Sequence, residues 1–128
     1  MRNFKMQFVI QAAPQDVYAA LTKQEMITAW TGEEAVMTPI AGTEFEWWGG
    51  DICGQNIEFE ENKKIVQQWY FGEDEPIPSI VTLKMYPHKR GTSLEINHLN
   101  IPDEAYDNIA EGWADIIVPS LQVLLEED

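Results

Sequence analysis

The region between residues 35 and 99 alternates apolar and polar side chains in short stretches, which glycine, proline or asparagine residues separate. This pattern is typical of an antiparallel meander in which every strand has one apolar face. A sheet of this kind must bury that face against a second layer, and nothing within residues 35–99 can supply the layer. The alternation therefore requires a cover from elsewhere in the 128-residue chain.

The segment after Pro102 has the pattern of that cover. Its apolar residues recur at helical spacing and predict one long amphipathic helix. The apolar stripe consists of Tyr106, Ile109, Ala110, Trp113, Ile117, Leu121 and Leu124. Pro119 lies within this helix. Because an interior proline removes a backbone hydrogen bond, we expect a kink or a break near Val118.

The N-terminal part of the chain predicts one strand followed by two short helices. Residues 3–11 alternate with a period of two, as in a half-buried strand. Pro14 suits the first turn of a helix. Thr22 and Glu25 have the spacing of a capping box, which predicts the start of a second helix, and Gly32 is placed to end it.

The order of these elements predicts a single domain. A strand, two short helices, a run of antiparallel strands and a long helix follow one another without an internal repeat or a linker. Because the first strand and the last helix must close the same core, we expect one α+β domain over residues 1–128. In it, a curved antiparallel sheet is wrapped around the C-terminal helix.

The charge of the chain excludes several classes of partner. Twenty-two Asp and Glu residues against eight Lys and Arg residues give a net charge of −14. Such a field repels nucleic acid and anionic lipid, so we expect neither a nucleic-acid partner nor a membrane. Cys53 is the only cysteine, which excludes an internal disulfide, and the sequence contains no run of about 18 apolar residues. These features predict a cytoplasmic protein.

The sequence contains none of the familiar catalytic motifs. No serine lies in a Gly-x-Ser-x-Gly turn, and no phosphate-binding glycine loop, His-Glu-x-x-His motif or EF-hand spacing is present. We therefore predict no catalytic residue, no metal site and no cofactor. The acidic run Glu73-Asp74-Glu75 is interpreted as a solvated loop, because neighbouring carboxylates alone do not form a coordination cage.

Aromatic and polar side chains gather on the predicted inner faces of the strands and the helix. The candidate ligand-binding residues are Phe45, Trp47, Gln67, Trp69, Phe71, Met85, His98, Trp113 and Ile117. Two interpretations remain open for the polar members, Gln67 and His98. They are either hydrogen-bonded core residues among ordinary packed aromatics, or anchors that orient an apolar ligand in a cavity.

Trp48 differs from these residues because strand alternation places it on the opposite, outer face. There it is expected to be exposed, on the same face as Glu44 and Glu46. An exposed tryptophan beside carboxylates is a candidate contact for a protein partner.

Several short motifs occur in a specific order along almost the whole chain. They are Ala13-Pro14 followed by Val17-Tyr18 and Leu21-Thr22; Gln24-Glu25 with Trp30; Gly50-Asp51-Ile52-Cys53-Gly54; Ile65-Val66-Gln67-Gln68-Trp69-Tyr70-Phe71; and Ile101-Pro102 leading to Glu111-Gly112-Trp113. In this order and spacing they resemble the C-terminal domain of the activators of the heat-shock protein 90 (Hsp90) ATPase, in the START-like, helix-grip superfamily. The resemblance implies a curved sheet around a long helix, with a groove or cavity between them.

The resemblance also implies a function. It is that of a non-enzymatic binding domain, a co-chaperone in the stress response, which binds a chaperone or another protein and has room for an apolar ligand between sheet and helix. The alternative is a stand-alone carrier or sensor of a hydrophobic small molecule such as a lipid or a polyketide. A third interpretation is a cyclase or hydrolase in which His98 and a nearby carboxylate act in the same cavity.

Overall fold

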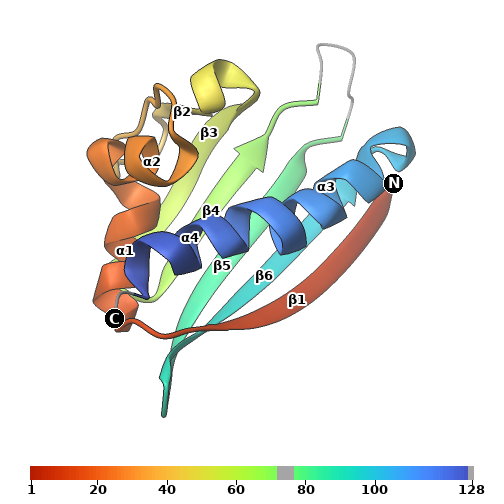
Figure 1. Ribbon diagram of the computed structural model, residues 1–128. Coiled ribbons are helices and arrows are strands. Elements are labelled where there is room, and N and C mark those ends of the chain that lie inside the picture. Colours follow the sequence, from red (N-terminus) through yellow and green to blue (C-terminus); the bar gives the residue numbers. More distant parts are fainter. Residues whose placement is uncertain (72–76, 127–128) are drawn as a thin grey trace.

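The computed structural model describes residues 1–71 and 77–126 and shows one six-stranded antiparallel sheet with a long C-terminal helix across one face (Figure 1). The acidic run at residues 73–75 lies outside the described residues. The strands are β1 (Arg2–Ile10), β2 (Glu44–Trp47), β3 (Ile52–Glu60), β4 (Lys64–Trp69), β5 (Ser79–His88) and β6 (Gly91–Ile101). Their order, β1-β6-β5-β4-β3-β2, confirms the predicted meander, and β1 pairs with its last strand.

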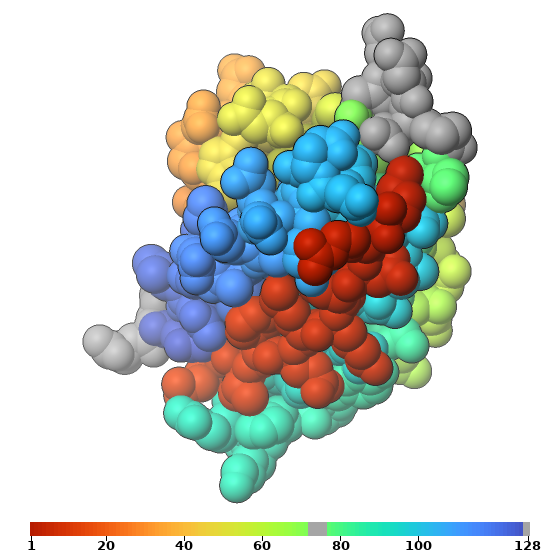
Figure 2. Space-filling view, turned by 90° about the vertical axis from the view of Figure 1, so that its right-hand side faces the viewer, coloured from red at the N-terminus to blue at the C-terminus, as the bar shows by residue number. Residues whose placement is uncertain are grey.

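The helices follow the predicted plan. They are α1 (Pro14–Thr22), α2 (Gln24–Thr31), the single turns η1 (Trp48–Gly50) and η2 (Asp103–Ala105), and a C-terminal helix made of α3 (Tyr106–Gly112), the π-helical turn η3 (Trp113–Ile117) and α4 (Val118–Leu125). Both α1 and α2 contact α4. Figure 2 shows the C-terminal helix packed alongside β1, and the Gln122 amide donates a hydrogen bond to the carbonyl oxygen of Val9 there.

The predicted apolar faces form one core. In the part of the chain that the structure describes, the inward residues of β2, β4, β5 and β6 are buried together with Trp113, Ile117 and Leu121 of the helix stripe, and Ile109 and Leu124 pack against them partly buried. Full burial of a large apolar side chain contributes about 2 kcal/mol, so the contact between sheet and helix is the main source of stability. The prediction that the final segment covers the sheet is confirmed.

The break that the sequence allowed near Val118 does not occur, because the C-terminal helix continues through Pro119, but the helix is irregular just before it. The amide of Val118 bonds to the carbonyl oxygen of Trp113, five residues earlier, so the helix widens into a π turn just before the proline. Pro119 then lies in the first turn of α4. The helix accommodates the missing amide by a change of hydrogen-bond register and is not broken.

The predicted capping box is also wrong, although α2 begins where it was expected. Thr22 is the last residue of α1, and its hydroxyl donates to the carbonyl oxygen of Tyr18 at 2.7 Å. The residue before α2 is Lys23, which makes no capping hydrogen bond. A threonine that ends one helix bonds back to that helix and does not cap the next one. The end of α2 at Gly32, with φ of +77°, is as predicted.

We expect Gly54→Ala to destabilise the domain by about 3 kcal/mol. A Cβ atom at Gly54 would overlap the carbonyl oxygen of Gln68 on β4, and backbone atoms within a paired sheet cannot move away. The matched control is Gly112→Ala in α3, where a Cβ atom meets open space and alanine favours the helix by about 0.5–1 kcal/mol. Urea unfolding of both variants is the measurement. Equal midpoints for the two variants would contradict the prediction.

Candidate functional site

Five aromatic rings pack at the centre of the domain, between the sheet and the C-terminal helix. Trp69 and Trp113 stack with ring centroids 5.1 Å apart, and Trp47 meets both edge-on at 5.7 and 6.4 Å. Trp30 of α2 and Phe45 of β2 complete the cluster around Trp47. Within the described residues, the Trp47 indole nitrogen is the only fully buried side-chain nitrogen or oxygen without a hydrogen-bond partner. These rings occupy the space in which the sequence predicts a ligand cavity.

His98 is fully buried in this region, and both of its ring nitrogens have protein partners. The indole N–H of Trp113 donates to Nδ1 at 3.2 Å, and Nε2 lies 2.8 Å from the hydroxyl oxygen of Ser79. Because an indole only donates, Nδ1 must accept, so the proton of neutral His98 sits on Nε2 and is donated to Ser79. Burial lowers the pKa of His98 to about 3, so the ring is neutral at physiological pH.

Gln67 belongs to a second buried hydrogen-bond chain. Its side-chain oxygen accepts from the Trp69 indole at 3.1 Å, and its amide donates to the side-chain oxygen of Asn56 at 3.1 Å. The Asn56 amide in turn donates to the carbonyl oxygen of Thr38 and the hydroxyl of Thr43. Both polar members of the candidate set are therefore hydrogen-bonded within the core, one of the two arrangements that the sequence left open.

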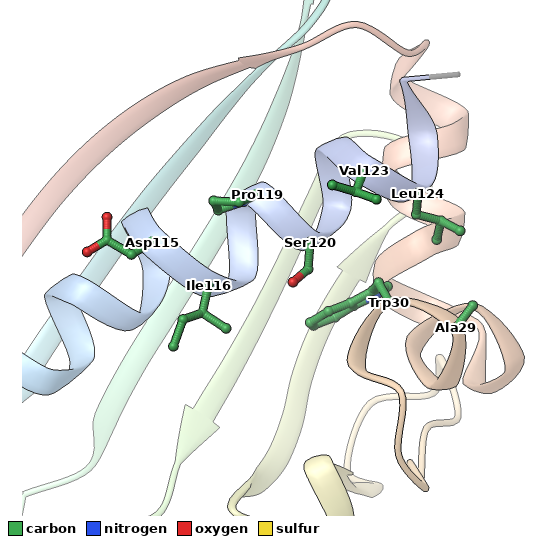
Figure 3. Close-up of a pocket in the computed structure, with 8 residues that line it drawn as sticks. All are labelled: Ala29, Trp30, Asp115, Ile116, Pro119, Ser120, Val123 and Leu124. Carbon is green, nitrogen blue, oxygen red and sulfur yellow. The ribbon is translucent and has the colours of Figure 1, made fainter. Parts of the chain in front are cut away.

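Two surface grooves border the C-terminal helix. The first, the α2 groove, has a volume of about 480 Å³ and lies between α2 and α4. Figure 3 shows the Trp30 ring reaching toward the helix on the side where Ile116 and Ser120 project. The second, the Trp48 groove, has a volume of about 340 Å³. It is lined by Trp48, Asp51, Ile52, Trp69, Asn108, Ile109, Gly112, Ile116 and Ile117.

The structure distributes the predicted ligand-binding residues unevenly. Trp69 and Ile117 line the Trp48 groove. Phe71, which follows the end of β4, borders a small hollow of about 40 Å³, and Met85 borders a pocket near the β3–β4 hairpin. The remaining residues lie in the interior: Phe45, Trp47, Gln67, His98 and Trp113. That these residues bind a ligand stays a prediction.

The predicted outward position of Trp48 is wrong. Strand β2 ends at Trp47, and Trp48 enters η1 with a left-handed φ of +53°. The strand alternation no longer applies there, so the ring is half-buried, meets Trp30 edge-on at 5.4 Å and lines the second groove. Gly49 and Gly50, which directly follow it, were the sequence signal that the strand had ended.

Cys53 shows no sign of activation as a nucleophile. It pairs with Glu46 across β2 and β3. Burial, with the carboxylates of Glu46 and Glu44 close by, raises the pKa of its thiol. A raised pKa disfavours the thiolate, which is the reactive form. Within residues 1–71 and 77–126, no group of three or more His, Cys, Asp or Glu side chains is placed to hold a metal ion.

A curved six-stranded antiparallel sheet that holds a long C-terminal helix, with two short helices after its first strand, defines a helix-grip, START-like domain. The family model described as "Activator of Hsp90 ATPase homolog 1-like protein" matches residues 11–126. The chain therefore belongs to the family of activator of Hsp90 ATPase homolog 1-like proteins, which confirms the resemblance noted from its motifs.

Individual relatives agree with this assignment. The chain is 27% identical over 114 residues to an activator of 90 kDa heat shock protein ATPase homolog from Dictyostelium discoideum, and 26% identical over 102 residues to homolog 1 from Homo sapiens. These matches cover 88% and 79% of this chain, which spans about 30% of the length of either relative. The crystal structure of an HSP90 activator from Plasmodium falciparum superimposes with a TM-score of 0.87 at 23% identity, over 95% of this chain and 94% of that one.

Among the helices described, none combines the length and the apolar character that crossing a membrane requires.

Proposed function

We propose that this domain is a protein-binding module that engages an Hsp90-type chaperone through its outer surface. Membership of the family, and relatives that are named activators of the 90 kDa heat shock protein ATPase, support this partner. The observation that carries the proposal is the packing of Trp47, Trp69 and Trp113, which occupies the space between sheet and helix. Binding then falls to the surface, where apolar residues border two grooves.

The charge of the domain supports a partner with a basic surface. A net charge of −14 on 128 residues accelerates encounter with a positive surface and repels a negative one. Because this attraction is screened by salt, binding should weaken steeply as ionic strength rises.

Calorimetric titration of the purified domain with the Hsp90 of the same cell tests the proposal. We expect binding at low ionic strength that weakens at least about tenfold at high ionic strength. Stimulation of the chaperone's ATP hydrolysis, measured in the same solutions, distinguishes an activator from a domain that only binds. The absence of binding at either ionic strength would overturn the proposal.

A second candidate function is the binding of a hydrophobic small molecule. It is favoured by the Trp48 groove, whose apolar lining and volume of about 340 Å³ fall within the range of about 300–1,000 Å³ that small-molecule sites occupy. Native mass spectrometry of the protein purified from its own cell tests this candidate. A bound molecule that Ile52→Glu abolishes would support it, and a protein free of ligand even after incubation with lipids and polyketides would refute it.

A further inference from the structure

The charges of this chain are separated along its sequence. Residues 24–62 and 91–128 contain eighteen of the 22 acidic residues and none of the eight Lys and Arg residues. These two segments supply α2, η1 and the start of β3 on one side, and the whole C-terminal helix on the other. Both grooves lie between these elements, and among the residues that the structure describes Trp69 is the only lining residue from another segment.

The two grooves form one continuous surface. Ile116 lines both of them, and Trp30 of the α2 groove contacts Trp48 of the second groove. Apolar side chains on this surface are unusually exposed: 54% for Ile116 and 82% for Val123. We call the lining residues of both grooves together the docking surface. Apolar side chains that are exposed together beside a groove are typical of an interaction site.

Two carboxylates line the docking surface, Asp115 on the helix side of the α2 groove and Asp51 in the Trp48 groove. Asp107 and Glu111 precede Asp115 on the C-terminal helix at intervals of four residues, and this row of carboxylates is exposed, although only Asp115 lines a groove. Asp51 lies on the opposite wall of the Trp48 groove. None of the ion pairs in the described part of the chain involves these four residues. The rim of the docking surface therefore carries negative charge that the domain itself does not neutralise.

The backbone at Trp48 adds an independent observation. A bulky side chain at a φ of +53° costs about 1 kcal/mol, whereas glycine adopts this conformation freely. The chain nevertheless carries a tryptophan there, and the ring lies where the two grooves meet. Strain of this kind at a surface groove supports a role for the ring in binding.

The shape of the docking surface suits a helix. It follows the C-terminal helix from Asn108 to Leu124, a length of about 24 Å at 1.5 Å per residue. Ile116, Ser120 and Val123 are separated by four and three residues. Side chains with this spacing lie along one side of a helix and can contact a second helix that runs parallel or antiparallel to it. Ser120, Ala29 and Gly112 are small, so a partner backbone can approach closely.

We propose that the docking surface binds a basic amphipathic helix of the partner protein, with the apolar side of that helix over Ile116 and Trp48 and its Lys and Arg residues against the row of carboxylates. The proposal rests on the proposed function for the statement that the ligand is a protein. A second copy of this chain that docked through the same surface would bring the same carboxylates and be repelled, and a lipid tail would leave the row of carboxylates unpaired.

Fluorescence anisotropy with a defined peptide tests the proposal on the full chain. The probe is a labelled sixteen-residue helix with leucine on one side and lysine on the other, and the comparison peptide has glutamate in place of lysine. We expect the lysine peptide to bind, the glutamate peptide to bind at least about tenfold more weakly, and the affinity of the lysine peptide to fall with added salt. The chaperone of the proposed function is titrated in parallel.

Two pairs of variants locate the contact. Ile116→Glu with Val123→Glu removes the apolar contact of the docking surface. Ile57→Glu with Tyr86→Glu is the control. These residues of β3 and β5 are 41% and 42% exposed and line neither groove, and their substitution changes the net charge by the same amount as the first pair does. We expect at least about tenfold weaker binding in the first pair and less than about twofold change in the control.

A matching pair tests the charges. Glu111→Gln with Asp115→Asn should weaken the lysine peptide, whereas Glu44→Gln with Glu46→Gln on β2 should leave it nearly unchanged. Circular dichroism of every variant establishes that a loss of binding does not come from unfolding.

The outcomes separate the two proposals. If the chaperone binds wild type and the Ile116→Glu, Val123→Glu pair equally, the inference is overturned and the proposed function stands. If the lysine peptide binds through this surface while the chaperone does not bind, the inference stands and the proposed function fails. Equal binding of the two peptides, binding of lipid vesicles alone, or a homodimer in sedimentation that the groove variants dissociate would each overturn the inference.

Discussion

Trp113→Ala is expected to destabilise the domain by about 4 kcal/mol, a large part of the about 5–15 kcal/mol that stabilises a domain of this kind. Trp113 is fully buried at the centre of the aromatic cluster, where it stacks on Trp69 and meets Trp47 edge-on. Its removal leaves a large cavity and also removes the hydrogen-bond donor to His98. The free energy of unfolding from urea titrations, followed by circular dichroism, is the measurement.

Two further variants divide this loss into its parts. Trp113→Phe keeps an aromatic ring in the stack but removes the indole N–H, and leaving the buried Nδ1 of His98 unpaired should cost about 1–3 kcal/mol. Trp48→Ala removes a half-buried ring that meets the core at Trp30 only edge-on, and it also relieves the left-handed backbone strain, so a loss of about 1 kcal/mol or less is expected. If Trp113→Ala unfolds at the same urea concentration as Trp48→Ala, the aromatic cluster is not the centre of the core.

The second large effect expected is a loss of stability at acidic pH caused by His98. Its pKa in the folded state is about 3, below the value of about 6.5 in an unfolded chain. Between these two values the unfolded state binds a proton that the folded state does not, so folding is disfavoured increasingly as pH falls. The stabilising contribution is fully present above pH 6.5 and decreases by up to about 1.4 kcal/mol per pH unit below it.

The difference between variants isolates this contribution from that of the carboxylates. The free energy of unfolding of His98→Gln is measured with urea at several pH values between 7 and 4 and plotted against pH. The variant should lose the part of the slope of this plot that comes from the histidine, although it is less stable than wild type at pH 7. His88→Gln is the matched control, because His88 lies in the β5–β6 hairpin and outside the core. A His98→Gln variant with the wild-type slope would show that His98 does not titrate on unfolding.

Periodicity in the sequence was sufficient to predict the sheet, its antiparallel order and its cover, because each pattern reports which face of an element is apolar. Alternation placed Val81, Leu83 and Met85 on one face of β5, and the structure buries all three. Where an element ended, the prediction failed. Trp48 directly follows the last residue of β2, and counting by two past that residue assigned it an outer face that the chain does not keep.

The candidate site was predictable as a set of inward residues but not as a geometry. His98 and Gln67 were expected on apolar faces, yet their partners Ser79 and Asn56 come from other strands that no sequence pattern links to them. The resemblance implied a groove or cavity between sheet and helix, but of the residues that line the two grooves only Trp69 and Ile117 were in the predicted set. Residues of α2, η1 and the C-terminal helix line them, and the distance between these elements depends on how the aromatic cluster packs beneath.

By itself, the sequence determined the α+β helix-grip plan, the family and the acidic character of the chain, because periodicity, motif order and charge are properties of the chain that folding does not alter. Only the tertiary structure decided that the tryptophans pack against one another between sheet and helix, and that the exposed apolar surface lies beside that helix. The physical reason is that side-chain packing depends on volumes and angles from several elements at once, which no local pattern encodes.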